Sequence, residues 1–206
     1  HYWVEFARDA AKKKAEKKEG EADDEEPLPE LVKETFQIEN ALRFQRQAVT
    51  VSERTLGLDH PDTMVHYINL SALERSAGHF DVALRYQDRI MELWQLLYGR
   101  DHPDAVHTLS SIALLLQSRQ DFDTSLQAYQ SSHDLALRLF GPDSIYTGNM
   151  AHELSQAYTL SGDLKTAIQV EKDAWRIFQD RLGADDALTP VSNTHLRAHE
   201  PLRQLE

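Results

Sequence analysis

The sequence predicts an all-α protein, an α-solenoid of antiparallel helix pairs with a 42-residue period. Apolar residues recur at helical spacing, and turn residues separate the helical segments. Internal repeats of about 20 to 50 residues are typical of solenoids, in which stacked neighbours bury a continuous core. Four glycines stand 42 residues apart in related segments: LGLDHPDT (56–63), YGRDHPDA (98–105), FGPDSIYT (140–147) and LGADDALT (182–189).

The second unit shows why each repeat predicts two helices. Asp59 or His60 can cap a first helix, because side chains with hydrogen-bond acceptors satisfy its free N–H groups. Pro61 suits the first turn of that helix, and Asp62 complements the positive end of the helix dipole. We therefore interpret the two His-Pro-Asp segments as helix starts rather than as metal ligands.

A second helix is expected to follow the turn at residues 77–79 and to end at Gly99. We expect Gly99 in the left-handed conformation that closes many helices. Trp94, near the end of this helix, recurs as Ala136 and Phe178. We expect this position to fill the space between successive helix pairs, so Trp94 should be buried.

Two further repeat positions indicate how the paired helices meet. Two helices approach closely only where a side chain is small, so a small position in the second helix marks the crossing point. An apolar position in the first helix should lie in the core. The small position is Ala83, Ser125 and Ala167, and the apolar one is Leu70, Ile112 and Leu154.

These patterns resemble tetratricopeptide repeats, which carry a leucine–small pair in the first helix, here Leu70-Ser71, and an aromatic-x-x-small step opening the second, here Phe80 to Ala83. The 42-residue form with G-x-D-H-P-D between units resembles the clustered mitochondria (Clu) family and, as a second choice, kinesin light chain. The string ELWQLLYGRDHPD (92–104) favours Clu. The resemblance covers residues 46 to 189, roughly, of the chain.

The Clu resemblance implies a cytoplasmic protein that acts in mitochondrial distribution and biogenesis. It also implies association with mRNAs for mitochondrial proteins and a link to translation initiation factor 3. The alternative resemblance implies a kinesin light chain-like, cargo-binding repeat domain. The chain lacks a start methionine, and we expect it to begin inside a longer protein with further domains.

The repeat array is expected at residues 34–189, and it opens with a lone second helix from Glu34 to Leu56. Residues 20–33 are acidic and contain two prolines, which predicts a disordered linker rather than a packed helix. Residues 1–19 are expected to form a separate helix. Residues 190–206 leave the repeat pattern.

Within this last segment, VSNTHLRAHE (191–200) resembles the translation of a sequencing adapter. A native tail and a sequence artefact are both open interpretations of residues 190–206.

Composition excludes several kinds of chemistry. The chain has no cysteine, so it can form neither disulfides nor thiolate metal sites. It contains no zinc-protease, phosphate-loop or serine-hydrolase motif. We expect no enzymatic activity and no cofactor. A formal net charge of −12 opposes nucleic-acid binding, so mRNA would bind only through other parts of the full protein.

The sequence also has no apolar run long enough to cross a bilayer, and we expect no membrane insertion. The expected partner is a protein bound as a peptide or helix in a concave groove lined by the first helices, and the translation machinery is a candidate partner. A plain solvated face is the open alternative. The candidate partner-binding residues are Ile68, Arg75, Ser76, His107, Ser110, Gln117, Asn149, His152 and Gln156.

Overall fold

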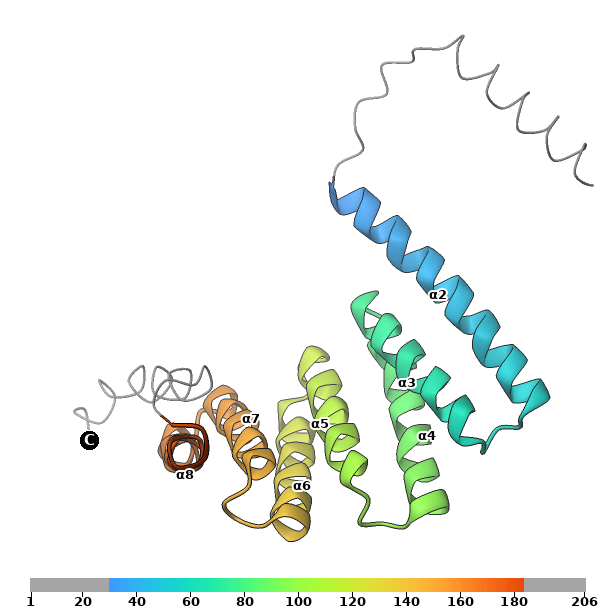
Figure 1. Cartoon of the computed structure of the whole chain (residues 1–206). Coiled ribbons are helices and arrows are strands. Elements are labelled where there is room, and N and C mark those ends of the chain that lie inside the picture. Colours follow the sequence, from blue (N-terminus) through green and yellow to red (C-terminus); the bar gives the residue numbers. More distant parts are fainter. Residues whose placement is uncertain (1–29, 184–206) are drawn as a thin grey trace, which may run out of the picture. The chain divides into compact units, whose positions relative to one another are not determined.

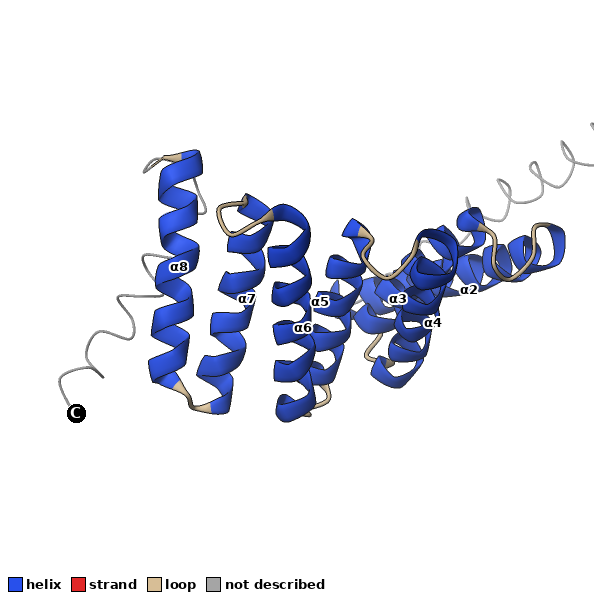
Figure 2. Ribbon diagram, turned by 90° about the horizontal axis from the view of Figure 1, so that it is seen from below, coloured by secondary structure: helices blue, strands red, loops and turns tan. Residues whose placement is uncertain are grey.

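A computed structural model describes the backbone of residues 30–183 and the side chains from residue 37 onward. This part of the chain contains seven helices and no strand (Figures 1 and 2). Contacts divide the chain at Ile38, and the repeats belong to the unit that begins there. The helices are α2 (Glu30–Thr55), α3 (Pro61–Ser76), α4 (Phe80–Tyr98), α5 (Pro103–Ser118), α6 (Phe122–Phe140), α7 (Ile145–Ser161) and α8 (Leu164–Leu182).

The all-α repeat fold expected from the sequence is confirmed. Helices α3 to α8 form three consecutive antiparallel pairs, and each pair corresponds to one 42-residue unit (Figure 1). Helix α2 is the second helix of the preceding unit. It begins at Glu30 instead of the expected Glu34, so the end of the expected linker is helical. The expected helix at 1–19, the rest of the linker and the tail at 190–206 lie outside the described residues.

Histidine caps the first helix in two of the three complete units, as predicted. The Nδ1 atom of His60 accepts a hydrogen bond from the backbone N–H of Asp62 at 3.1 Å. His102 accepts from the N–H of Asp104 in the same way at 3.3 Å. The next unit uses Ser144 instead. These imidazoles satisfy helix ends, which explains why they recur at the repeat period.

Gly99 adopts a positive φ, as expected, but not the left-handed helical conformation. Its φ of 93° and ψ of 173° leave the backbone extended, because the chain must run on to the extended cap residue His102. The left-handed conformation occurs instead inside a unit, where Gly162 has φ 88° and ψ −1°. Gln120 occupies the same repeat position with φ 64°, a conformation that costs a side chain more than it costs glycine.

The small residues mark the helix crossings, as predicted. The Ser71 hydroxyl of α3 donates to the Ala83 carbonyl oxygen of α4 at 3.0 Å. In the next unit the roles are exchanged: the Ser125 hydroxyl of α6 donates to the Ala113 carbonyl oxygen of α5 at 2.8 Å. All four residues are buried. A hydroxyl reaches the backbone of the facing helix only because the facing residue is small.

The apolar position of the first helices is only partly as predicted. Leu70 and Leu154 are buried, whereas Ile112 is half-buried and its neighbour Ala113 is fully buried. Helix α5 carries an unbroken apolar run from Ile112 to Leu116. A small rotation of this helix therefore exposes no polar group to the core, and the repeat position alone does not fix which side chain points inward.

The column of Trp94 and Phe178 fills space in two different ways. Trp94 is 8% exposed, its Nε1 donates to the Thr108 hydroxyl of α5 at 3.1 Å, and its ring stacks on His102. Phe178 fills the space left by a glycine within α7. A Cβ at Gly148 would lie 2.9 Å from the Cε1 atom of the Phe178 ring. The size of the second-helix residue is thus matched by its first-helix neighbour.

The Trp94 environment yields a stability prediction. Trp94→Ala should lower the free energy of unfolding by about 3–5 kcal/mol, because it leaves a cavity and removes the hydrogen bond from the indole to Thr108. Leu96→Ala on the same helix should change it by less than about 0.5 kcal/mol, since Leu96 is 65% exposed. Urea unfolding measures both. Equal effects of the two substitutions would place Trp94 outside the core.

The turn inside each unit yields a second prediction. Gly162→Ala should lower the free energy of unfolding by about 1 kcal/mol, because alanine resists this backbone conformation while its Cβ meets no neighbour within 4 Å. Gln120→Gly should raise the free energy of unfolding by up to about 1 kcal/mol, as it relieves the corresponding strain. Urea unfolding measures both changes. A lower free energy of unfolding in Gly162→Ala together with a higher one in Gln120→Gly supports the strain at Gln120, and a loss of stability in Gln120→Gly contradicts it.

Candidate functional site

The predicted partner-binding residues all lie on the three first helices, and we call this surface the first-helix face. Every one of them is at least partly accessible to solvent. Three come from each of the helices α3, α5 and α7, in this order: Ile68, Arg75, Ser76; His107, Ser110, Gln117; Asn149, His152, Gln156.

Predicted residues connect α5 to α7 on this face. The Ser110 hydroxyl donates a hydrogen bond to the carboxylate of Glu153. The His107 ring contacts the Tyr146 ring edge-on, with 5.9 Å between centroids. Two neighbouring units therefore present imidazole, phenol, hydroxyl and carboxylate groups side by side. Such groups can bind the backbone and side chains of a peptide.

His152 is held from behind by a buried carboxylate. Its Nδ1 lies 2.8 and 3.0 Å from the two carboxylate oxygens of Glu171, which is fully buried on α8. The Ser155 hydroxyl donates to the same carboxylate. A buried charge needs such partners, since an unpaired one is costly. His152 is thus oriented by Glu171, and on the face its Nε2 lies 2.9 Å from the Gln156 amide nitrogen.

Ser155, His152 and Glu171 are the residue types of a hydrolytic triad, but their arrangement differs from one. In a triad the serine hydroxyl faces the imidazole and is open to substrate. Here Ser155 is fully buried, and its single hydroxyl proton lies between two acceptors, the carboxylate and the backbone carbonyl of His152. The cluster orients a histidine and offers no accessible nucleophile.

The predicted residues on α3 are less connected to the rest of the face. The Ser76 hydroxyl donates to the Ala72 carbonyl oxygen of its own helix at 3.1 Å. Ile68 is 38% exposed, and Arg75 is exposed. Ser110 and His107 of α5 instead contact the α7 residues Glu153 and Tyr146, which were not predicted. The α3 residues extend the same row.

Sequence reasoning missed Glu153 and Glu171. The sequence does contain a signal for Glu171. Its equivalents in the two preceding units, Gln87 and Tyr129, are also polar, and all three residues are buried. The charge of Glu153 also has a measurable effect nearby. Burial, and then the negative charge of Glu153, raise the pKa of Tyr129 to about 12.

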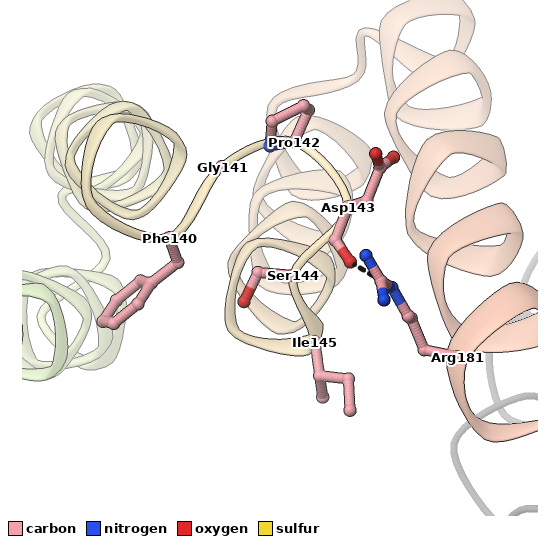
Figure 3. Close-up of a pocket in the computed structure, with 7 residues that line it drawn as sticks. All are labelled: Phe140, Gly141, Pro142, Asp143, Ser144, Ile145 and Arg181. Atoms are coloured by element: carbon pink, nitrogen blue, oxygen red, sulfur yellow. Dashed lines mark hydrogen bonds between the residues drawn. The ribbon is translucent and has the colours of Figure 1, made fainter.

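A separate depression lies at the loop between α6 and α7 (Figure 3). Its one basic side chain, Arg181 of α8, is already engaged, because its Nε donates to the Asp143 carbonyl oxygen at 2.9 Å. The lining residues are Phe140 to Ile145 and Arg181, so none of the predicted residues takes part.

Residues 30–183 offer neither a metal-binding cluster nor a membrane-spanning helix. Over this part of the chain, no cluster of three or more metal-ligating side chains could hold a metal ion. Nor does any helix described there have the length and apolar character to span a bilayer.

The chain is similar to curated proteins called clustered mitochondria protein homolog. The homolog of Malassezia globosa is 68% identical over 216 residues, which cover 95% of this chain and 16% of that protein. The homolog of Mycosarcoma maydis is 57% identical over 190 residues, covering 92% of this chain and 13% of that protein. The chain thus spans about a sixth or less of the length of these relatives.

Solved structures show the same fold. A putative kinesin light chain of Podosopora anserina with TPR-like repeats aligns with a TM-score of 0.71 at 15% identity, covering 84% of this chain and 82% of that one. BtubC from P. vanneervenii aligns with a TM-score of 0.64 at 14% identity, over 85% of this chain and 67% of that one. At these identities the likeness concerns the fold alone.

The tetratricopeptide repeat family model matches residues 33–89 and 104–180. These matches cover the units that the glycine spacing predicts, and the resemblance to the repeat region of Clu proteins is confirmed by the relatives above. The chain belongs to the tetratricopeptide repeat family.

Proposed function

We propose that this chain is a protein-interaction scaffold of a Clu-like protein, and that its first-helix face holds a peptide or helix of a partner. The observation that carries the proposal is the row of hydrogen-bonding side chains on three successive first helices. Ser110 and His107 are held by residues of α7, and His152 is held by Glu171. A face oriented in advance loses less conformational entropy on binding.

The proposed role of the whole protein is mitochondrial distribution and biogenesis in the cytoplasm, with links to translation initiation factor 3 and to mRNAs for mitochondrial proteins. The similarity to clustered mitochondria protein homologs supports it. Because the chain has a net charge of −12, mRNA contact is assigned to other parts of the full protein. The chain itself is proposed to carry out no catalysis.

A kinesin light chain-like, cargo-binding domain is the second candidate. The solved Podosopora anserina structure with a TM-score of 0.71 favours it on the fold, although its identity to this chain is only 15%. The two candidates use the same kind of surface and differ in the partner.

The test compares the full chain with a variant that alters the first-helix face: Arg75→Ala, His107→Ala, Gln117→Ala and Gln156→Ala. His152 is left unchanged, because its removal would take away one of the hydrogen-bond partners of the buried Glu171 carboxylate and destabilise the fold. A matched control replaces exposed residues of the second helices: Arg85, Gln95, Gln127 and Gln169, each by Ala. Each protein is immobilised, and bound fungal cytosolic proteins are quantified by mass spectrometry.

We expect translation initiation factor 3 subunits to bind the unchanged chain and the control, and to fall at least about ten-fold with the face variant. Circular dichroism should show equal helicity for all three proteins. Enrichment of kinesin heavy chain or cargo adaptors instead would support the second candidate. Equal binding by the face variant contradicts the proposed surface, and nanomolar RNA binding by the chain in a filter assay contradicts the assignment of mRNA contact elsewhere.

A further inference from the structure

Helix α2 exposes apolar side chains along one side. Phe44 and Val51 are each 60% exposed, and Ala48 lies between them on the same side, since residues three and four apart are neighbours on a helix. A groove of about 400 Å³ runs beside Ala48, Val51 and Leu56 and is bordered on its other side by His66 of α3. We call Phe44, Ala48, Val51 and Thr55 the α2 stripe.

The corresponding side chains of the other second helices are buried. Ala48 and Val51 occupy repeat positions whose other six members range from 0% to 4% exposed. The members are Ile90 and Leu93 in α4, Ser132 and Leu135 in α6, and Ala174 and Ile177 in α8. The repeat position of Val51 is therefore at most 4% exposed in the other three units and 60% exposed in α2.

The first helix of the same unit covers these positions elsewhere. In the last unit, Ile177 of α8 packs against α7, where a Cβ at Gly148 would lie 3.2 Å from its Cγ2 atom. In the unit before, the Ser132 hydroxyl of α6 donates to the Val106 carbonyl oxygen of α5 at 2.9 Å. The α2 stripe is thus shaped to receive a helix in the position of a first helix.

The opposite side of α2 is already occupied by α3. Ser52 and Thr63 share a hydrogen bond of 2.7 Å between their hydroxyls, and the Tyr67 hydroxyl donates to Glu53 at 2.8 Å. Arg46 forms an ion pair with the buried Glu74 at 2.7 Å. Helix α3 borders the stripe through His66 but leaves Val51 60% exposed, and the described residues include no first helix for this unit.

The charges beside the stripe indicate what kind of helix fits. Arg43 and Arg54 lie along one flank, whereas the chain as a whole carries a net charge of −12. The Arg43 guanidinium lies 5.0 Å from the centroid of the Phe44 ring. Glu39 and Arg43 line a second groove, which also borders Val51, and Glu39 offsets part of this charge. An occupant with acidic residues beside its apolar side complements the remaining positive flank.

We propose that the α2 stripe binds an acidic amphipathic helix of a partner protein, seated as a first helix would be. The length of the covering helices, 16 residues in α3 and α5, sets the length of the occupant. Its apolar side fills the groove beside Val51, and its acidic side faces Arg43 and Arg54. This surface is separate from the first-helix face, so the two proposals stand or fall independently.

Two labelled peptides test the proposal. Both have the sequence of α3 (residues 61–76), which covers the equivalent position of α4, and they differ only at four residues that are exposed there: 65, 68, 72 and 75. One peptide carries Glu at all four and the other carries Lys. Fluorescence anisotropy measures their binding to the full chain, to Val51→Glu and to the control Leu96→Glu, which alters a comparably exposed residue of α4.

We expect the Glu peptide to bind the chain at least about ten-fold more tightly than the Lys peptide, with the preference weakened by high salt. Val51→Glu should weaken binding at least about ten-fold, and Leu96→Glu should leave it unchanged. Circular dichroism controls for folding. No difference between Val51→Glu and Leu96→Glu, or a preference for the Lys peptide, overturns the proposal.

Two other occupants have distinct outcomes. If the Glu peptide binds only to a chain that lacks residues 1–29, those residues are the occupant of the stripe, and the proposal of a partner helix is overturned. If sedimentation shows a dimer that Val51→Glu dissociates, a second copy is the occupant and the proposal is likewise overturned.

Discussion

The close crossing of the two helices in each unit is the contact on which the rest of the array depends. At Ser71 and Ala83, and again at Ala113 and Ser125, a hydroxyl of one helix reaches a carbonyl oxygen of the other. A larger side chain at either place would push the helices apart and leave a buried hydroxyl without its acceptor, which costs roughly 1–3 kcal/mol. The hydrogen bond can run in either direction, so the units tolerate an exchange of serine and alanine between the two helices.

This crossing also decides which surfaces are left for binding. A second helix gives one side to its own first helix and the other side to the first helix of the next unit. First helices keep one side open, and the polar residues of α5 and α7 meet there through Ser110 and Glu153. Among residues 30–183, the second helix without a first helix of its own unit is α2, and it is the one with an open apolar side. Both candidate binding surfaces therefore follow from the same packing rule.

The sequence predicted the repeat, the helix pairs, the histidine caps and the crossing points, because each depends on residue types that recur every 42 residues. It did not predict that Ile112 is only half-buried, since an unbroken apolar run permits either side to face inward. Nor did it predict the contact of His152 with Glu171, because the repeat position of Glu171 does not indicate which side chain of α7 it meets. The nine residues of the first-helix face share a surface, but their binding role remains a prediction.

The match between Gly148 and Phe178 has a consequence for how such an array can change. The phenyl ring of one helix uses the volume that the other helix lacks, so neither residue suits a unit in which the other is different. Alanine stands in the place of Phe178 in the preceding unit, opposite valine rather than glycine. The units share a backbone plan but not an interchangeable interior. Duplicating or exchanging whole units would preserve these matched pairs, whereas recombination between the two helices of a unit would break them.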